Sequence, residues 1–317
     1  MDVNNTKKGL ICGVIATICI GFQPIVANAR PSVLDPYLFA AMTVFVEALV
    51  FFPIMLLERR KIKTEFKKDL ISSKESESIL YGYKKNIPLL FFVGSIFGIG
   101  QILFFIGYSL SGAINGSLAQ KSTIFFSLLF GFLILHEKVS WNQIIFSGLL
   151  FFGLILAVTE GSFNLLQLNP GVLILLLLSS LWMMAHTFTK PVFDRKEAIP
   201  SQMVVIRNGI GFIILISTYF IFFPLENAQL LLDPVNLFWG FAMGAVYGTG
   251  LFFWYKTLTY IQIGTATIIT SLTPFTTVLF SFIILGDGFT IFHLIGTFIM
   301  IFSIVMIVRE KEIKLNL

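Results

Sequence analysis

Charged residues are scarce in this 317-residue chain: Asp, Glu, Lys and Arg make up 12%, whereas soluble domains carry about 25%. Hydrophobic residues make up 56% of the sequence. A soluble fold of this length could not bury so much apolar surface, so the composition excludes that class. Apolar runs of about 18 or more residues recur along the chain and are continuous rather than alternating. They predict an all-α integral membrane protein and exclude a membrane β-barrel.

Motifs that carry enzyme chemistry are also missing. The sequence has no phosphate-binding G-x4-G-K-[ST] loop, which excludes an ATP-driven pump within this chain, and no G-x-S-x-G or C-x-x-C motif. The stretch H-E-K-V-S at 136–140 begins like the zinc motif H-E-x-x-H, but Ser140 stands at the second ligand position. The two cysteines, Cys12 and Cys19, are expected to be small packing residues. We therefore expect no enzyme activity, no metal and no cofactor.

The net charge of +5 does not indicate a nucleic-acid partner, because the basic residues gather between the apolar runs. If the N-terminus is cytoplasmic, most of the 22 Lys and Arg residues fall on the cytoplasmic side, as membrane proteins favour. We expect a multi-pass protein of the cell membrane (plasma or inner membrane) with both ends in the cytoplasm.

The apolar runs predict ten transmembrane helices of about 18–24 residues, each long enough to cross about 30 Å of hydrocarbon. The predicted spans are 9–28, 36–57, 87–109, 113–135, 141–159, 170–190, 200–223, 234–256, 262–285 and 289–308. The predicted organisation is a cytoplasmic N-terminus (1–8), a first five-helix repeat (9–159) with a cytoplasmic loop at 58–86, an external linker (160–169), a second five-helix repeat (170–308) and a cytoplasmic C-terminus (309–317).

An internal repeat supports the division into halves. Residues 94–137 align with 244–287 at an offset of 150, and each segment ends on an acid. Glycines coincide in Gly94/Gly244, Gly98/Gly248 and Gly100/Gly250. Because five helices per half is an odd number, equivalent helices run in opposite directions. The halves are therefore predicted to be inverted repeats, a frequent arrangement in secondary transporters.

Short motifs carry a family resemblance. They are Gly-Phe-Gln-Pro at 21–24, Leu-Thr-Pro-Phe at 272–275, and the segments 135–140 and 285–287 that close the fourth helix of each half. With these motifs the chain resembles the drug/metabolite transporter superfamily, specifically its EamA-type members, over residues 9–308. The resemblance implies two five-helix repeats and a central cavity lined by helices 1–4 and 6–9, and it identifies the substrate poorly.

The sequence departs from the family pattern at several positions. Ile20 replaces the usual Trp before the first motif, although Trp182 keeps it in the second half, and Ile124 replaces the usual Pro of helix 4. The family's Arg in the second helix of the repeat is present as Arg207, and its counterpart in the first half is Thr43.

Three ionisable residues fall well inside predicted spans: Glu47, Lys121 and Arg207. An unpaired charge at mid-bilayer costs about 2.5–3.5 kcal/mol, so such residues pair, face a cavity or function. Glu47 and Lys121 are predicted at similar depth, which allows an ion pair that only fixes packing. Alternatively they line the cavity, where Lys121 would attract a carboxylate or phosphate and Glu47 an amine or a proton. Arg207 is interpreted first as structural.

The remaining candidates are polar or aromatic residues of the same spans. The substrate-binding candidates are Glu47, Lys121, Gln23, Gln120, Arg207, His186 and Trp254. His186 is interpreted first as a hydrogen-bonded packing residue. The candidates for hinges or close helix packing are Pro24, Pro274, Gly94, Gly98, Gly244 and Gly248.

The sequence thus favours a secondary transporter, an exporter or exchanger of small organic metabolites or amphiphiles, working by alternating access about a midplane cavity. Its expected partners are a small-molecule substrate, the lipid bilayer and, as a candidate coupling ion, the proton, and it is expected to be a monomer or homodimer. One alternative is a membrane-embedded enzyme acting on a lipid-linked substrate, and another is a sensor or scaffold.

Overall fold

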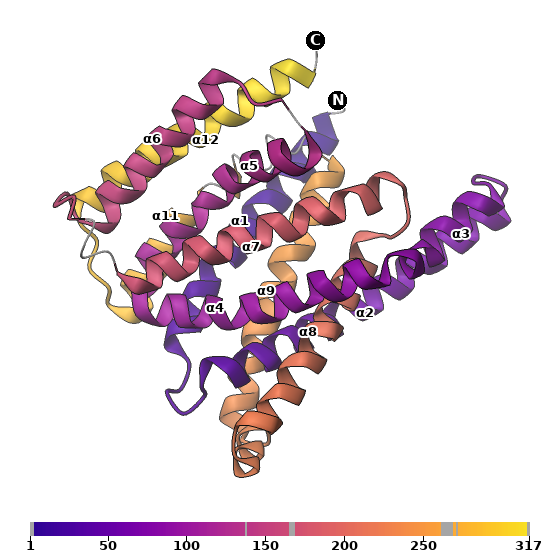
Figure 1. Ribbon diagram of the computed structural model, residues 1–317, viewed down its shortest axis with the longest axis horizontal. Coiled ribbons are helices and arrows are strands. Elements are labelled where there is room, and N and C mark those ends of the chain that lie inside the picture. Colours follow the sequence, from indigo (N-terminus) through magenta and orange to yellow (C-terminus); the bar gives the residue numbers. More distant parts are fainter. Residues whose placement is uncertain (1–2, 137, 165–168, 261–268, 271, 316–317) are drawn as a thin grey trace. The chain divides into compact units, whose positions relative to one another are not determined.

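The computed structural model describes residues 3–136, 138–164, 169–260, 269–270 and 272–315, and within these ranges the chain forms helices and no strand (Figure 1). The helices are α1 (Val3–Ala29), α2 (Pro36–Lys67), α3 (Ser73–Tyr81), η1 (Gly82–Asn86), α4 (Ile87–Ala119), η2 (Gln120–Ser122), α5 (Thr123–Leu135), α6 (Trp141–Val158), α7 (Pro170–Asp194), α8 (Pro200–Phe222), η4 (Leu225–Leu231), α9 (Pro234–Tyr260), α11 (Thr273–Phe280), η5 (Ser281–Leu285) and α12 (Ile291–Leu315).

Eight segments of the described ranges are long and apolar enough to cross a membrane, which confirms the expected all-α membrane class there. The segment Ser73–Leu135 is interrupted at Gly112, whose φ of 75° breaks the helix where the sequence predicted a connection between two spans. Thr273–Leu285 forms a shorter apolar helix. The rest of the predicted span 262–285 falls largely outside the described residues, so the count of ten helices stays a prediction.

Local sequence signals explain where several helices begin. Pro36 and Pro200 stand at the first positions of α2 and α8, where proline loses no helical hydrogen bond. The Asp35 carboxylate caps α2 by accepting hydrogen bonds from the backbone N–H groups of the first turn. Ser140 and Gln143 form a reciprocal capping box at the start of α6.

The chain divides into two compact units. The first unit comprises residues 1–30, 103–180 and 249–317, and the second comprises residues 31–102 and 181–248. Helices α4, α7 and α9 contribute one part to each unit.

In the second unit, α2 and α8 pack along each other in antiparallel directions (Figure 1). Near the start of α2, the Tyr219 hydroxyl donates to the Asp35 carboxylate at 3.0 Å. Toward the other end of α2, Ser201 donates to the Glu58 carboxylate. The start of α2 therefore lies beside the end of α8, and the later part of α2 lies beside the start of α8. The two helices are antiparallel.

Glycines let α4 approach α8 closely in the second unit. A Cβ added at Gly94 would lie 2.7 Å from the Ile210 side chain and 3.1 Å from the backbone oxygen of Arg207. A Cβ added at Gly98 would lie 3.0 Å from the Cα of Gly211. These two glycines thus hold the backbone of α8 against α4 at the turn that carries Arg207.

The glycines of α9 likewise let α9 approach α2 closely. A Cβ added at Gly244 would lie 2.4 Å from the Val46 side chain, next to Glu47 in the sequence, and 3.1 Å from the backbone oxygen of Thr43. A Cβ added at Gly248 would lie 3.2 Å from the Val50 side chain. The close approach of α9 therefore positions the turn of α2 that carries Glu47.

The segment 58–86, expected as a solvated loop, contains the end of α2, α3 and η1. Its residues contact the α7–α8 connection: Lys196 pairs with Glu75 at 2.7 Å, and Asn86 donates to Glu197 at 2.8 Å. Hydrogen bonds from Arg195 and then from Asn86 hold the pKa of Glu197 below its usual value of 4.5. This polar cluster joins the ends of four helices of the second unit.

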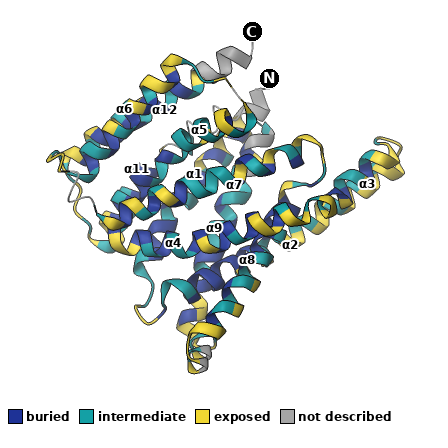
Figure 2. Ribbon diagram, in the orientation of Figure 1, coloured by how far each residue is buried: buried dark blue, intermediate teal, exposed yellow. Residues whose placement is uncertain are grey.

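In the first unit, α6 and α12 form an antiparallel pair (Figure 1). Gln143 near the start of α6 donates to the backbone oxygen of Ile307, whereas Gly153 lies against Gly296 near the start of α12. Both helices carry a buried face and an exposed face (Figure 2). Such one-sided burial is expected of helices whose outer faces meet lipid.

The prolines predicted as hinges lie in α1 and α11 of the first unit. Pro24 lies within α1, which continues to Ala29. Pro274 stands in the first turn of α11. The two helices pack together, and the Thr277 hydroxyl donates to the backbone oxygen of Gly21 at 3.0 Å.

Replacing Gly98 with leucine tests the glycine contacts of the second unit. Since the added side chain meets the backbone of α8, we expect a loss of stability of about 1–3 kcal/mol, read as a lower midpoint of thermal unfolding in detergent. Gly209→Leu is the matched control, because nothing lies within 4 Å of a Cβ added at that helical glycine. Equal effects of the two substitutions would contradict the packing described.

Candidate functional site

The most deeply buried charges of the described chain meet in the second unit, between α2 and α8. Arg207 Nη2 lies 3.4 Å from Glu47 Oε1, and the two side chains are 6% and 3% exposed. The predicted depths allowed Lys121 as one possible partner of Glu47, but the charged partner in the structure is Arg207. The guanidinium is permanently charged, so burial away from water is tolerable only beside a counter-charge.

Aromatic side chains enclose the guanidinium. The Arg207 Cζ lies 4.0 Å from the centroid of the Phe97 ring, in cation–π contact. Phe97 in turn stacks on Trp182 at 6.3 Å and meets the His186 ring edge to face at 5.3 Å. His186 is exposed, whereas Phe97 is buried, so the imidazole forms the accessible edge of this aromatic layer.

One buried donor of the ion pair, Arg207 Nε, has no hydrogen-bond acceptor within the described chain. The side-chain amide of the neighbouring Asn208 lies next to the Glu47 carboxylate. Tyr247 of α9 lies close enough to interact electrostatically with Glu47 and Arg207. A buried donor without an acceptor is unfavourable by about 1–3 kcal/mol. This cluster can therefore donate a hydrogen bond to an oxygen atom of a ligand or of a water molecule.

Lys121 belongs to the first unit and has a different partner from the one expected. Its ammonium donates to the backbone oxygen of Thr270 at 2.9 Å, and the side chain is half-buried. A lysine carries three donors and this contact uses one of them. Lys121 thus keeps the capacity to bind an anionic or carbonyl oxygen.

The other candidates of the first unit lie on three elements. Gln120 of η2 is half-buried and accepts a hydrogen bond from the Tyr108 hydroxyl at 3.2 Å. Gln23 of α1 is 7% exposed and lies near Gly250 of α9, and Trp254 of α9 is half-buried. The structure describes no hydrogen bond that joins Lys121 to Gln23 or Trp254.

Several residues of the site escaped the sequence analysis. Phe97 and Tyr247 could not be recognised from the sequence, because the apolar helices contain many aromatic residues. Only their contacts in the structure distinguish them. Asn208 could have been identified, because a polar residue adjoins Arg207 within the same span. His293 also lies in a span, and its Nε2 pairs with Asn115 Oδ1 at 3.0 Å in the first unit.

Of the residues that resembled a zinc motif, Glu137 lies outside the described residues. His136 ends α5 in a left-handed conformation with φ of 56°, and its side chain is exposed. Among the described residues, no group of three or more His, Cys, Asp or Glu side chains could hold a metal ion.

A family model and one relative among known proteins both name a transporter. The model of the EamA-like transporter family matches residues 7–159 and again residues 169–309. An "Uncharacterized transporter" from Methanothermobacter thermautotrophicus is 25% identical over 303 residues, covering 92% of this chain and 84% of that protein. A solved structure, described only as "Crystal structure of protein", has a TM-score of 0.62 at 12% identity and covers 96% of this chain and 99% of its own, which concerns the fold alone.

The buried ion pair can be tested by a double-mutant cycle with Glu47→Met and Arg207→Met. Glu47→Met leaves a buried guanidinium and is expected to lower stability by about 3–5 kcal/mol. Arg207→Met is expected to be milder, because a carboxyl group can take up a proton whereas a guanidinium cannot release one. The double variant should lie close to the wild type, measured by reversible unfolding in mixed micelles.

The exposed pair Lys61–Glu65, with 3.8 Å between its charged atoms, serves as the control cycle. Its coupling should not exceed about 0.5 kcal/mol. Additive effects of Glu47→Met and Arg207→Met would show that the two side chains do not interact in the membrane-embedded protein.

Proposed function

Because the chain belongs to the EamA-like transporter family, we propose that it is a secondary transporter that moves small organic metabolites or amphiphiles by alternating access. Membership makes it a multi-pass membrane transporter, whose partners are the bilayer and a small-molecule substrate. The proposal adds the direction, outward or in exchange, and the mechanism.

The observation that carries the proposal is the double match of one family model, to 7–159 and to 169–309. Two copies of one unit in a membrane chain are the usual basis of alternating access. The direction of equivalent helices supports an inverted relation between the copies. The second helices of the two halves, α2 and α8, run antiparallel, and so do the fifth helices, α6 and α12.

Packing inside the second unit supports the same relation. Gly94 of α4 lies against Ile210 of α8, and its counterpart Gly244 of α9 lies against Val46 of α2. Glycines that are equivalent by the repeat thus pack on equivalent helices of the opposite half. This crosswise exchange is what two inverted copies produce when they interlock.

Within this mechanism we assign the chemistry to two polar groups. Glu47 would take up and release a proton, and Arg207 would donate a hydrogen bond to an acceptor group of the substrate, because the buried Arg207 Nε lacks an acceptor in the described chain. Lys121 would bind an anionic or carbonyl oxygen of the substrate with the donors that Thr270 leaves unused. Exchange at a buried pair requires that the pair part and re-form as the protein changes conformation.

Transport can be tested in proteoliposomes loaded with the small-molecule fraction of a carbon-13-labelled cell extract. Mass spectrometry of the external medium, with and without an imposed pH gradient, identifies which compounds cross. We expect specific compounds to leave faster than from protein-free liposomes, and a pH gradient to change their rate. Lys121→Met should lower the rate on the order of tenfold, since it removes a charged hydrogen-bond donor.

Matched variants separate function from folding. Lys67→Met changes an exposed lysine at the end of α2 and should transport normally. The double variant Glu47→Met/Arg207→Met should fold but lose the response to the pH gradient. Unchanged coupling in the double variant would contradict the assigned role of the pair, and chemical conversion of a compound without its translocation would favour an enzyme instead.

A further inference from the structure

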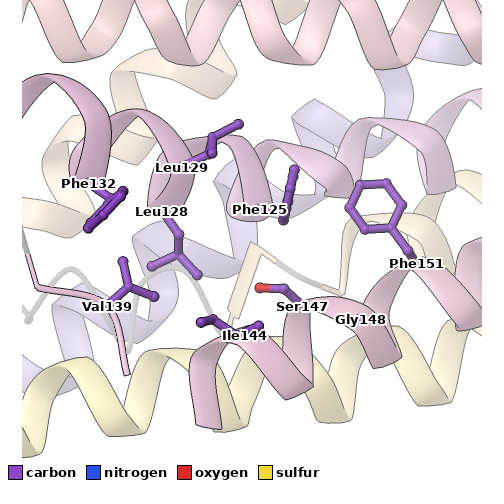
Figure 3. Close-up of a pocket in the computed structure, with 9 residues that line it drawn as sticks. All are labelled: Phe125, Leu128, Leu129, Phe132, Val139, Ile144, Ser147, Gly148 and Phe151. Carbon is purple, nitrogen blue, oxygen red and sulfur yellow. The ribbon is translucent and has the colours of Figure 1, made fainter. Parts of the chain in front are cut away.

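An apolar groove of about 470 Å³ lies between α5 and α6 of the first unit (Figure 3). Its walls follow the helical repeat: Phe125 and Phe132 stand two turns apart on α5, and Ile144 and Phe151 stand two turns apart on α6. Seven residues of helix correspond to about 10 Å, which sets the length of the groove. None of the candidate substrate-binding residues lines it.

The groove runs from an aromatic pair to the connection between the two helices. The rings of Phe125 and Phe151 meet edge to face with centroids 4.9 Å apart at one end. Val139, in the connection between the two helices, lines the other end (Figure 3). Because this connection joins two membrane-spanning segments, that end lies toward a bilayer surface.

The described side chains leave this space unfilled, and its lining suits water poorly. Nothing lies within 4 Å of a Cβ added at Gly148, which lines the groove. The hydroxyl of Ser147 is polar, but it already donates to the backbone oxygen of Gln143 at 2.7 Å. Water needs two to four polar partners to occupy a cavity, and the lining residues do not supply them. In a bilayer such a lining favours an alkyl chain.

The mouth of the groove carries side chains suited to a lipid headgroup. Lys138 is exposed beside Val139, and Trp141, the first residue of α6, is 77% exposed. Lysine near a membrane surface attracts lipid phosphate, and tryptophan favours the headgroup level. Glu137, which precedes Lys138 in the sequence, lies outside the described residues. A depth of about 10 Å fits a chain from one leaflet, which is about 15 Å thick.

We propose that the α5–α6 groove binds one acyl chain of a membrane phospholipid, whose phosphate lies beside Lys138. The bound chain completes the packing between α5 and α6, which protein side chains leave incomplete. This site depends on the chain being a membrane protein but not on its cargo, so failure of the transport assay would leave it standing.

Native mass spectrometry of the full chain in detergent tests the proposal by titration with dioleoyl phosphatidylglycerol and dioleoyl phosphatidylcholine. We expect one tightly bound phospholipid per chain. Gly148→Leu fills the groove and should weaken binding on the order of tenfold, because it displaces buried methylene groups. Gly209→Leu, at another helical glycine with open space around it, should bind lipid as the wild type does.

Two further arms separate the chain from the headgroup. Lys138→Gln, in the exposed connection, leaves the helices intact and should weaken phospholipid binding severalfold while leaving binding of an alkyl maltoside unchanged. Glycerophosphoglycerol, which has the phosphate but no acyl chain, should not bind measurably. Wild-type lipid affinity in Gly148→Leu, or loss of a dimer rather than of lipid in that variant, would overturn the proposal.

Discussion

A buried guanidinium imposes the strongest constraint on this protein. Arg207 cannot lose its charge, so the α2–α8 pair is stable only if Glu47 remains within reach and Phe97 covers the cation. The carboxylate and the aromatic face come from α2 and α4, so three helices of the second unit must keep their register. An apolar residue at both positions would impose no such demand, and this is the reason why we propose a functional role for the pair.

Close approach of backbones supplies that register. Gly94 and Gly98 bring α4 to the turn of α8 that carries Arg207, and Gly244 brings α9 to the turn of α2 that precedes Glu47. Lipid offers no hydrophobic drive for helix association, so van der Waals contact between backbones is the main means available. In these contacts α4 of the first half packs on α8 of the second half, and α9 of the second half packs on α2 of the first half. The packing that stabilises the ion pair therefore depends on both copies of the repeat.

The sequence predicted the class of fold and most helix boundaries, because apolar runs of span length and positive charges between them are strong signals. It also identified each buried charge. It did not identify the pairing, because the comparison of depths placed Glu47 level with Lys121 and ignored the reach of the Arg207 side chain along its helix. The first span was predicted to run past Pro24 to residue 28, and α1 continues to Ala29, since a membrane environment favours an unbroken helix over exposed backbone.

The α5–α6 groove was beyond sequence reasoning for a similar reason: Phe and Leu positions read alike whether they meet protein or lipid. The groove and the polar cluster of the second unit relate to the bilayer in opposite ways. The apolar walls of the groove bind an alkyl chain, whereas the buried ion pair is shielded from the lipid. The polar cluster depends on Glu47 and Arg207 remaining charged inside the membrane.

The most direct measurement of that charge is the infrared difference spectrum between the wild type and Glu47→Gln in lipid at neutral pH. We expect the substitution to remove the bands of an ionised carboxylate, as an ion pair with Arg207 requires. Loss of a protonated carboxyl carbonyl band instead would contradict it.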